Sequence, residues 1–354
     1  NIKKIFPGVM LALVFCLFSQ GINNVLAIEI FGTSKSPIST VLIAILLGIL
    51  MGNAFTPRPG MMIGLDFTQQ YILKLGIIFL GIRLSFEELV KFGSIAIPLI
   101  ICCIIGVLIL VKLLIKKVSI SSKMSYLIAI GTSVCGATAI VATAPVINAK
   151  KTEIAYAIAN ITLFGVIAMI IYPYFAEWYF DDNSLKTGLF LGTSIHETSQ
   201  VAAAGLIYDQ QFNNPETLNV ATVTKLIRNT SLVIMIPLFA FLYNRGEVKD
   251  KKYSIFSIFP YFVLGFIGMI MVRNLGDQFF YLENDNYDLW INLIESIKIL
   301  ATVFLTMAMA AVGISINLNE LKSMGYKPFV VGLIAAITVG IISLIYLETV
   351  TIFI

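Results

Sequence analysis

The sequence predicts an all-α membrane protein that crosses the bilayer many times, and composition and the length of its apolar runs both support this. Of 354 residues, 58% are hydrophobic and 12% are charged, whereas about a quarter of the residues in a soluble domain are charged. Apolar runs of roughly 18 to 25 residues, long enough to cross the hydrocarbon core as helices, recur along the chain. We therefore expect one transmembrane domain over 1–354 with about 9 to 11 membrane segments.

The apolar runs give the order of the expected spans. They cover residues 5–20, 38–54, 68–84, 93–115, 152–176, 216–243, 254–273, 289–317 and 327–353. The first run follows two lysines, as in a signal peptide, but lacks a convincing small-residue cleavage site, so we interpret it as a retained helix. Two further stretches, 124–148 and 185–209, are long enough to span but are poor in Leu and rich in Gly, Ser and Thr.

Charge distribution predicts the orientation of these spans. Lysine and arginine gather at 3–4, 112–123 and 245–252, which the positive-inside rule places in the cytoplasm together with the N-terminus. The acidic loop at 277–288 then lies outside. The charges at 150–151 and 181–182 fit the rule if each Gly-rich stretch enters the membrane and returns on its own side, although two broken spanning helices remain the alternative. The net charge of +4 therefore reflects topology, and we expect no nucleic-acid partner.

Two internal similarities indicate a repeat. GIRLSFEEL at Gly81–Leu89 and GISINLNEL at Gly313–Leu321 share Gly, Ile, Glu and Leu, and they end spans of opposite predicted direction. Four identities in nine residues are not rare in apolar sequence. Inverted repeats are common in secondary transporters, which bind their substrate near the midplane, at the interface between the repeats.

The second similarity joins the two Gly-rich stretches. GTSVCGATAIVATAP at Gly131–Pro145 and GTSIHETSQVAAAG at Gly192–Gly205 open alike and continue through small and polar residues. Unpaired backbone groups cost several kcal/mol in hydrocarbon, so such segments must line a cavity or pack inside protein. Interrupted helices turn free N–H groups toward a ligand, which favours an anion. Close helix packing through small residues is the alternative.

Four ionisable residues lie in segments expected to be buried. His196 and Glu197 are candidates for coupling transport to an ion gradient, because intramembrane titratable groups usually mark such pathways; alternatively, the pair caps the second segment. Lys225 and Arg228 lie about 10 to 15 Å into their apolar run and need an anion, supplied either by a substrate or by an ion pair with Glu197. HETSQ lacks the second histidine of a zinc protease motif, and the four cysteines form no CxxC, so we expect neither metal nor cofactor.

At these residues the chain resembles the YeiH-like sulfate exporter family of bacterial membrane proteins. The resemblance rests on GTSVCGATAIVATAPVI at 131–147, GTSIHETSQVAAAG at 192–205 and VTKLIRN at 223–229, and it extends over essentially the whole chain. Relatives often have CGASAI where this chain has CGATAI, a change at Thr138 that keeps the hydroxyl. The family is similar to bile acid:sodium symporters and cation/proton antiporters. That similarity implies a core domain, about 93–243, that moves against a scaffold of the remaining helices, often in a homodimer.

The sequence thus predicts a secondary active transporter of a small oxyanion, such as sulfite, sulfate or an organosulfonate, in the bacterial inner membrane. Its coupling ion would be H+ or Na+, and the family name would make it an exporter; a passive anion channel is the alternative. An enzyme is not expected, because the chain has no GxSxG, HExxH or nucleotide-binding loop. The candidate substrate contacts are Thr132, Ser133, Thr138, Thr193, Ser194, Gln200, Lys225 and Arg228, and the candidate coupling residues are His196 and Glu197.

Overall fold

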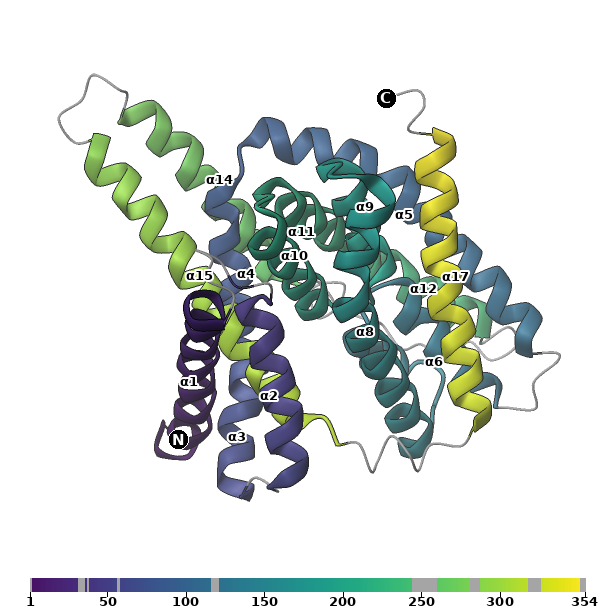
Figure 1. Ribbon diagram of the computed structural model, residues 1–354. Helices are drawn as coiled ribbons and strands as arrows, with labels where there is room; N and C mark the ends of the chain where they lie inside the picture. The colour runs from purple at the N-terminus through teal and green to yellow at the C-terminus, as the bar shows by residue number, and fades with distance from the viewer. Residues whose placement is uncertain are drawn as a thin grey trace. The chain divides into compact units, whose positions relative to one another are not determined.

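The chain is an all-α polytopic membrane protein, as the sequence predicted (Figure 1). The computed structural model describes residues 2–30, 36, 38–55, 58–115, 121–243, 260–280, 287–317 and 326–350, which form helices and short connections. Six helices in this part of the chain are long and apolar enough to cross a membrane. They cover Lys4–Ile30, Pro59–Arg83, Phe86–Val111, Lys151–Phe180, Tyr287–Ser315 and Tyr326–Val350, and the shorter apolar helix Thr40–Ala54 adds to them.

The helices divide into two compact units. The first combines 1–90, 202–219 and 261–318. It holds α1 (Ile2–Val25), α2 (Thr40–Ala54), α3 (Pro59–Phe67), α4 (Leu73–Leu80), α14 (Phe262–Phe279) and α15 (Tyr287–Ser315). Helix α15 packs against both α2 and α4, and α1 packs against α2 and α3, as Figure 1 shows.

The matched glycines of the predicted repeat have equivalent packing roles in this unit. Gly81 ends α4, and a Cβ there would lie 2.4 Å from the carbonyl oxygen of Phe266 on α14. Gly313 lies in the last turn of α15, and a Cβ there would lie 2.4 Å from the carbonyl oxygen of Ile45 on α2. Each glycine therefore permits a close approach between backbones, although residues 318–321 of the second copy lie outside the described residues.

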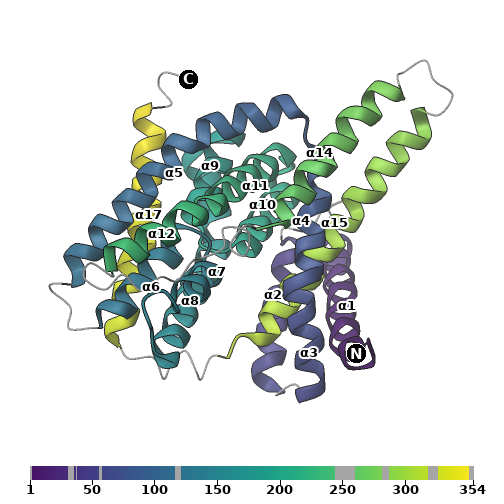
Figure 2. The same cartoon turned by 180° about the vertical axis from the view of Figure 1, so that it is seen from behind.

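The second unit combines 91–201, 220–260 and 319–354 and contains both Gly-rich stretches. Helix α17 (Tyr326–Val350) packs against α6 (Ser122–Ser133), α8 (Lys151–Phe180) and α9 (Ser184–Ser194), and Figure 2 shows this group from behind. Close contacts explain its small residues. A Cβ on Gly192 would lie 2.6 Å from Cβ of Thr224, so α9 approaches α11 (Pro215–Thr230) at this glycine.

Both Gly-rich stretches are interrupted helices. Helix α6 ends at Ser133, a turn covers 134–136, and α7 (Ala137–Thr143) follows. Gly136 has a φ of +66°, a conformation that favours glycine because other residues pay a steric cost there. Helix α9 ends at Ser194, residues 195–197 form a bend, and α10 (Thr198–Phe212) follows.

The two ends of the first interrupted stretch lie near each other. The Ser121 hydroxyl, at the start of α6, donates a hydrogen bond to the Glu153 carboxylate in the first turn of α8. Lys123 Nζ donates to the carbonyl oxygen of Asn148 at 2.7 Å. These contacts are those expected of a segment that returns to its side of origin, and its orientation in the membrane stays a prediction.

One sequence expectation changes in detail. The predicted span 216–243 is divided at Ser231 into α11 and α12 (Leu232–Tyr243). The Ser231 hydroxyl and N–H both donate to the carbonyl oxygen of Arg228, which closes a turn instead of continuing the helix. Of the predicted span 254–273, the structure describes 260–273, where α14 begins at Phe262; its first six residues lie outside the described part, as do 116–117, 245–252, 283 and 285.

Candidate functional site

Two cations on α11 meet both helix interruptions. Lys225 and Arg228 are one turn apart, and their side chains are 1% and 0% exposed. Each makes its polar contacts with backbone carbonyl oxygens at the breaks after α6 and α9. The site is therefore built by one continuous helix that holds two broken ones.

The ammonium group of Lys225 donates hydrogen bonds to three carbonyl oxygens. Nζ donates to Val134 at 3.1 Å, to Ile195 at 3.0 Å and to His196. An ammonium group has three N–H donors. All of them are thus engaged, one with the first break and two with the second.

Arg228 joins the ends of α6 and α9 through its planar guanidinium. Nε donates to the carbonyl oxygen of Ser133 at 2.8 Å, and one terminal nitrogen donates to that of Thr132. The other terminal nitrogen donates to Thr193 at 2.5 Å and to Ile195 at 3.4 Å. Because the guanidinium presents a rigid fork of donors, one side chain serves both helix ends.

The position of these cations follows from what helix ends leave unsatisfied. The last four carbonyl groups of a helix have no intrahelical partner, and the end carries a partial negative charge. In α6 the carbonyl groups of Ile130 and Gly131 accept from the following turn, which leaves those of Thr132 and Ser133 for Arg228. Buried carbonyl groups without partners would be costly, so the cations stabilise both interruptions.

Glu197 links the second interruption to the start of α7. Its Oε1 accepts a hydrogen bond from the N–H of Ala137 at 3.4 Å. A Cβ on Gly136 would lie 2.4 Å from Cγ of Glu197, so the carboxylate side chain occupies space that only glycine leaves open. Glu197 is half-buried, whereas its neighbour His196 is 1% exposed. The contact caps α7 of the first interrupted stretch, whereas the capping role that the sequence left open for this pair was in the second stretch.

The formal charges around the two breaks do not balance. Among the ion pairs between described residues, none joins Lys225 or Arg228 to a carboxylate, so the alternative ion pair with Glu197 does not form here. Two positive side chains and one negative one leave a net charge of +1 if all three are ionised. Buried uncompensated charge is unfavourable, which makes this site suited to a further anion.

The other predicted contacts are placed as follows. The Thr193 hydroxyl donates to Leu189 at 2.7 Å and lies 2.8 Å from the Ser343 hydroxyl of α17, while the Ser133 hydroxyl donates to Ala129. The Thr132 and Ser194 hydroxyls are buried without a hydrogen-bond partner. Thr138 is exposed on α7, so the structure does not bring it into the buried part of the site.

Gln200 is fully buried and ties α10 to α8. Its Nε2 donates to the carbonyl oxygen of Thr162 at 3.3 Å, and its Oε1 accepts from the N–H of Glu197 at 3.2 Å. A Cβ on Gly165 would lie 1.9 Å from that Oε1, so a glycine of α8 makes room for the side chain. Sequence reasoning missed Gly165 and Ser343, because each lies in an ordinary apolar span and gains its role only through packing.

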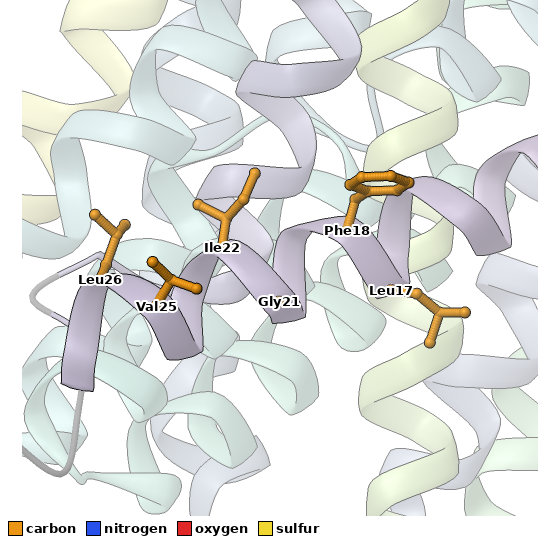
Figure 3. A pocket seen from close by; sticks show the side chains of 6 residues that line it. All are labelled: Leu17, Phe18, Gly21, Ile22, Val25 and Leu26. Carbon is orange, nitrogen blue, oxygen red and sulfur yellow. The ribbon is translucent and has the colours of Figure 1, made fainter. Parts of the chain in front are cut away.

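An apolar hollow on the first unit offers no comparable chemistry. It is lined by Leu17, Phe18, Gly21, Ile22 and Val25 of α1 and by Leu26 of the short π-helix (Leu26–Ile30) that continues it, as Figure 3 shows. No charged or hydroxyl side chain contributes to this lining. Such a surface suits lipid and cannot hold an anion by hydrogen bonds. Within the described residues no three His, Cys, Asp or Glu side chains gather as a metal site would require.

Comparison with known proteins identifies the family. A family model described as "Conserved hypothetical protein 698" matches residues 8–332. A UPF0324 membrane protein of Streptococcus agalactiae is 32% identical over 345 residues, which cover 96% of this chain and 95% of the relative. The chain belongs to the UPF0324 family of membrane proteins.

Other UPF0324 relatives cover the same region. A protein of Fusobacterium nucleatum is 33% identical over 321 residues, covering 89% of this chain and 91% of the relative. One of Yersinia pestis is 32% identical over 307 residues, covering 82% and 79%. No solved structure matches the chain. UPF0324 is the YeiH-like group that the sequence motifs indicated, so this expectation is confirmed.

Proposed function

We propose that this UPF0324 protein is a secondary active transporter of a small oxyanion, with sulfite, sulfate and small organosulfonates as the substrates to test. The observation that carries the proposal is the pair of buried cations at two helix interruptions, with one carboxylate to offset them. Such interruptions at membrane depth are typical of transporter binding sites. Transport, and not catalysis, fits a site whose polar groups are mostly backbone.

In this proposal Lys225 and Arg228 act mainly through their charge. Their donors are directed at carbonyl oxygens, so a direct contact with the anion would require these donors to exchange partners. They hold the two breaks in place and attract an anion to the site. The hydroxyls of Thr132 and Ser194, which have no partner, are then the predicted substrate contacts with free polar atoms.

Glu197 is the proposed coupling residue, with His196 beside it. Its carboxylate is half-buried and accepts a hydrogen bond from the N–H of Ala137. Protonation of Glu197 would weaken that hydrogen bond and raise the net charge at the site by one. Anion binding would then be linked to proton binding, which favours H+ over Na+ as the coupling ion.

Uptake by the purified protein in proteoliposomes tests the proposal. Radiolabelled sulfite, sulfate and taurine would be supplied with and without pH and sodium gradients, and protein-free liposomes serve as the control. We expect saturable uptake of at least one of these anions. Uptake indistinguishable from that of empty liposomes for every anion would refute an oxyanion carrier, whereas flux insensitive to both gradients would favour the passive channel.

A further inference from the structure

The first turn of α10 differs from the other three ends at the two interruptions. The ends of α6 and α9 accept hydrogen bonds from Arg228 and Lys225, and the start of α7 donates to Glu197. Within the described residues, no charged side chain bonds the start of α10. Its first helical bond runs from Val201 N–H to Glu197 O, so the amides of the preceding turn have no helical acceptor.

The electrostatic balance points to the same end. The two interruptions contain two helix starts, which are partly positive, and two helix ends, which are partly negative, so their partial charges cancel. The net charge of the site is then the sum of the formal charges of Lys225, Arg228 and Glu197. Their sum is positive, and the helix end without a charged partner is also positive. One anion at the start of α10 would balance the net positive charge and would also accept hydrogen bonds from the free amides of that helix start.

Asn229 supplies an independent sign of a ligand at this turn. The side chain is 3% exposed, and its Nδ2 donates to the Thr198 hydroxyl, the first residue of α10, at 2.9 Å. Its Oδ1 has no partner. The two ends of a carboxamide are exchanged by a half-turn, after which the Thr198 hydroxyl donates to Oδ1 and the amide group is free to donate to an anion.

His196 is a second buried residue with unsatisfied polar atoms, two positions before α10 in the chain. It directly precedes Glu197, the residue before α10, and it is 1% exposed with neither ring nitrogen bonded. A neutral imidazole carries one N–H donor. The adjoining residues Glu197 and Thr198 are half-buried in an otherwise buried stretch, so this turn is the accessible part of the segment.

We propose that the oxyanion binds at the first turn of α10, held by the amides of Thr198, Ser199 and Gln200, the Asn229 carboxamide and the His196 N–H. Lys225 and Arg228 supply the compensating charge without direct contact. The inference rests on the proposed function and deepens it by placing the anion and by adding Asn229 and Thr198 to the site.

Anion titration of purified full-length protein tests this placement. Thermal stabilisation by sulfate, sulfite and taurine would be measured for the wild type, Asn229→Asp and Thr198→Val. Asn229→Asp keeps the shape of the side chain but places a carboxylate where the anion would bind. The matched control is Asn160→Asp, because Asn160 is also fully buried, donates through Nδ2 to Pro328 at 2.7 Å and has an unpartnered Oδ1.

For an anion that stabilises the wild type, we expect Asn229→Asp to raise its Kd at least about tenfold, the effect of losing a hydrogen bond to a charged group. Thr198→Val should raise it less, and Asn160→Asp should stay within about twofold. Size exclusion would establish folding. If Asn229→Asp is not monodisperse, the Kd of Thr198→Val tests the placement instead. Wild-type affinity in the folded variants would overturn the placement alone, whereas a wild type that responds to no anion would overturn the proposed function.

Discussion

Arg228 donates through Nε to the carbonyl oxygen of Ser133 at 2.8 Å, so a cation of α11 closes the last turn of α6. The same guanidinium reaches Thr193 near the end of α9. Sequence reasoning expected Arg228 to contact the substrate, which stays a prediction. The structure shows a side chain that holds two interrupted helices together, and its replacement should first affect stability.

Arg228→Lys should therefore destabilise the protein even though it keeps the charge. An ammonium group has three donors, whereas Arg228 bonds four carbonyl groups, and each buried carbonyl left without a donor costs about 1–3 kcal/mol. We expect the melting temperature in detergent to fall by several degrees. Lys298→Ala is the control, because its pair with Glu295 is exposed and should contribute little. Equal stability of Arg228→Lys and the wild type would show that the bonds to carbonyl groups are dispensable.

Gly136→Ala should disturb the position of Glu197. With φ +66° and ψ −131°, position 136 lies in a sparsely populated region that costs a non-glycine residue about 1–3 kcal/mol, and the added Cβ would lie 2.4 Å from Cγ of Glu197. We expect reduced anion uptake and a lower melting temperature. Gly268→Ala on α14 is the matched control, since no atom lies within 4 Å of its added Cβ. If both variants transport like the wild type, the close approach of Glu197 and Gly136 has no functional role.

Glu197→Gln separates coupling from binding. The variant keeps a side chain that can accept from Ala137 N–H but cannot change its charge. Gradient-driven accumulation should be lost, while exchange of labelled for unlabelled anion continues at least in part, because exchange need not move the coupling ion. Glu348→Gln, in an exposed pair with Lys186, is the control. Full accumulation by Glu197→Gln would place the coupling site elsewhere.

The membrane orientation of the first interrupted stretch can be tested by cysteine labelling. The contacts of Ser121 with Glu153 and of Lys123 with Asn148 bring its two ends together. We expect an impermeant thiol reagent, applied to intact cells, to label Asp182→Cys but not Lys151→Cys. The background would lack the four native cysteines. The reverse pattern would mean that 124–148 crosses the membrane completely.

The sequence was sufficient for the features that depend on local pattern. Apolar length predicted the helices, and the Gly-rich motifs predicted the interruptions near Gly136 and His196. The partners of Lys225 were not predictable, because the carbonyl groups that it binds belong to every residue type and are freed only when a helix breaks. Thr138 was chosen for its hydroxyl; the structure places it exposed on α7, and its contact with a substrate stays a prediction.

Concentrative uptake tests the central claim most directly. Proteoliposomes containing the wild type would be loaded with equal concentrations of labelled oxyanion inside and outside, and a pH gradient would then be imposed. An active transporter predicts net movement of the anion away from equal concentrations, abolished by a protonophore that collapses the gradient. An anion distribution that stays at the value set by the membrane potential alone, with the pH gradient present or collapsed, would contradict secondary active transport.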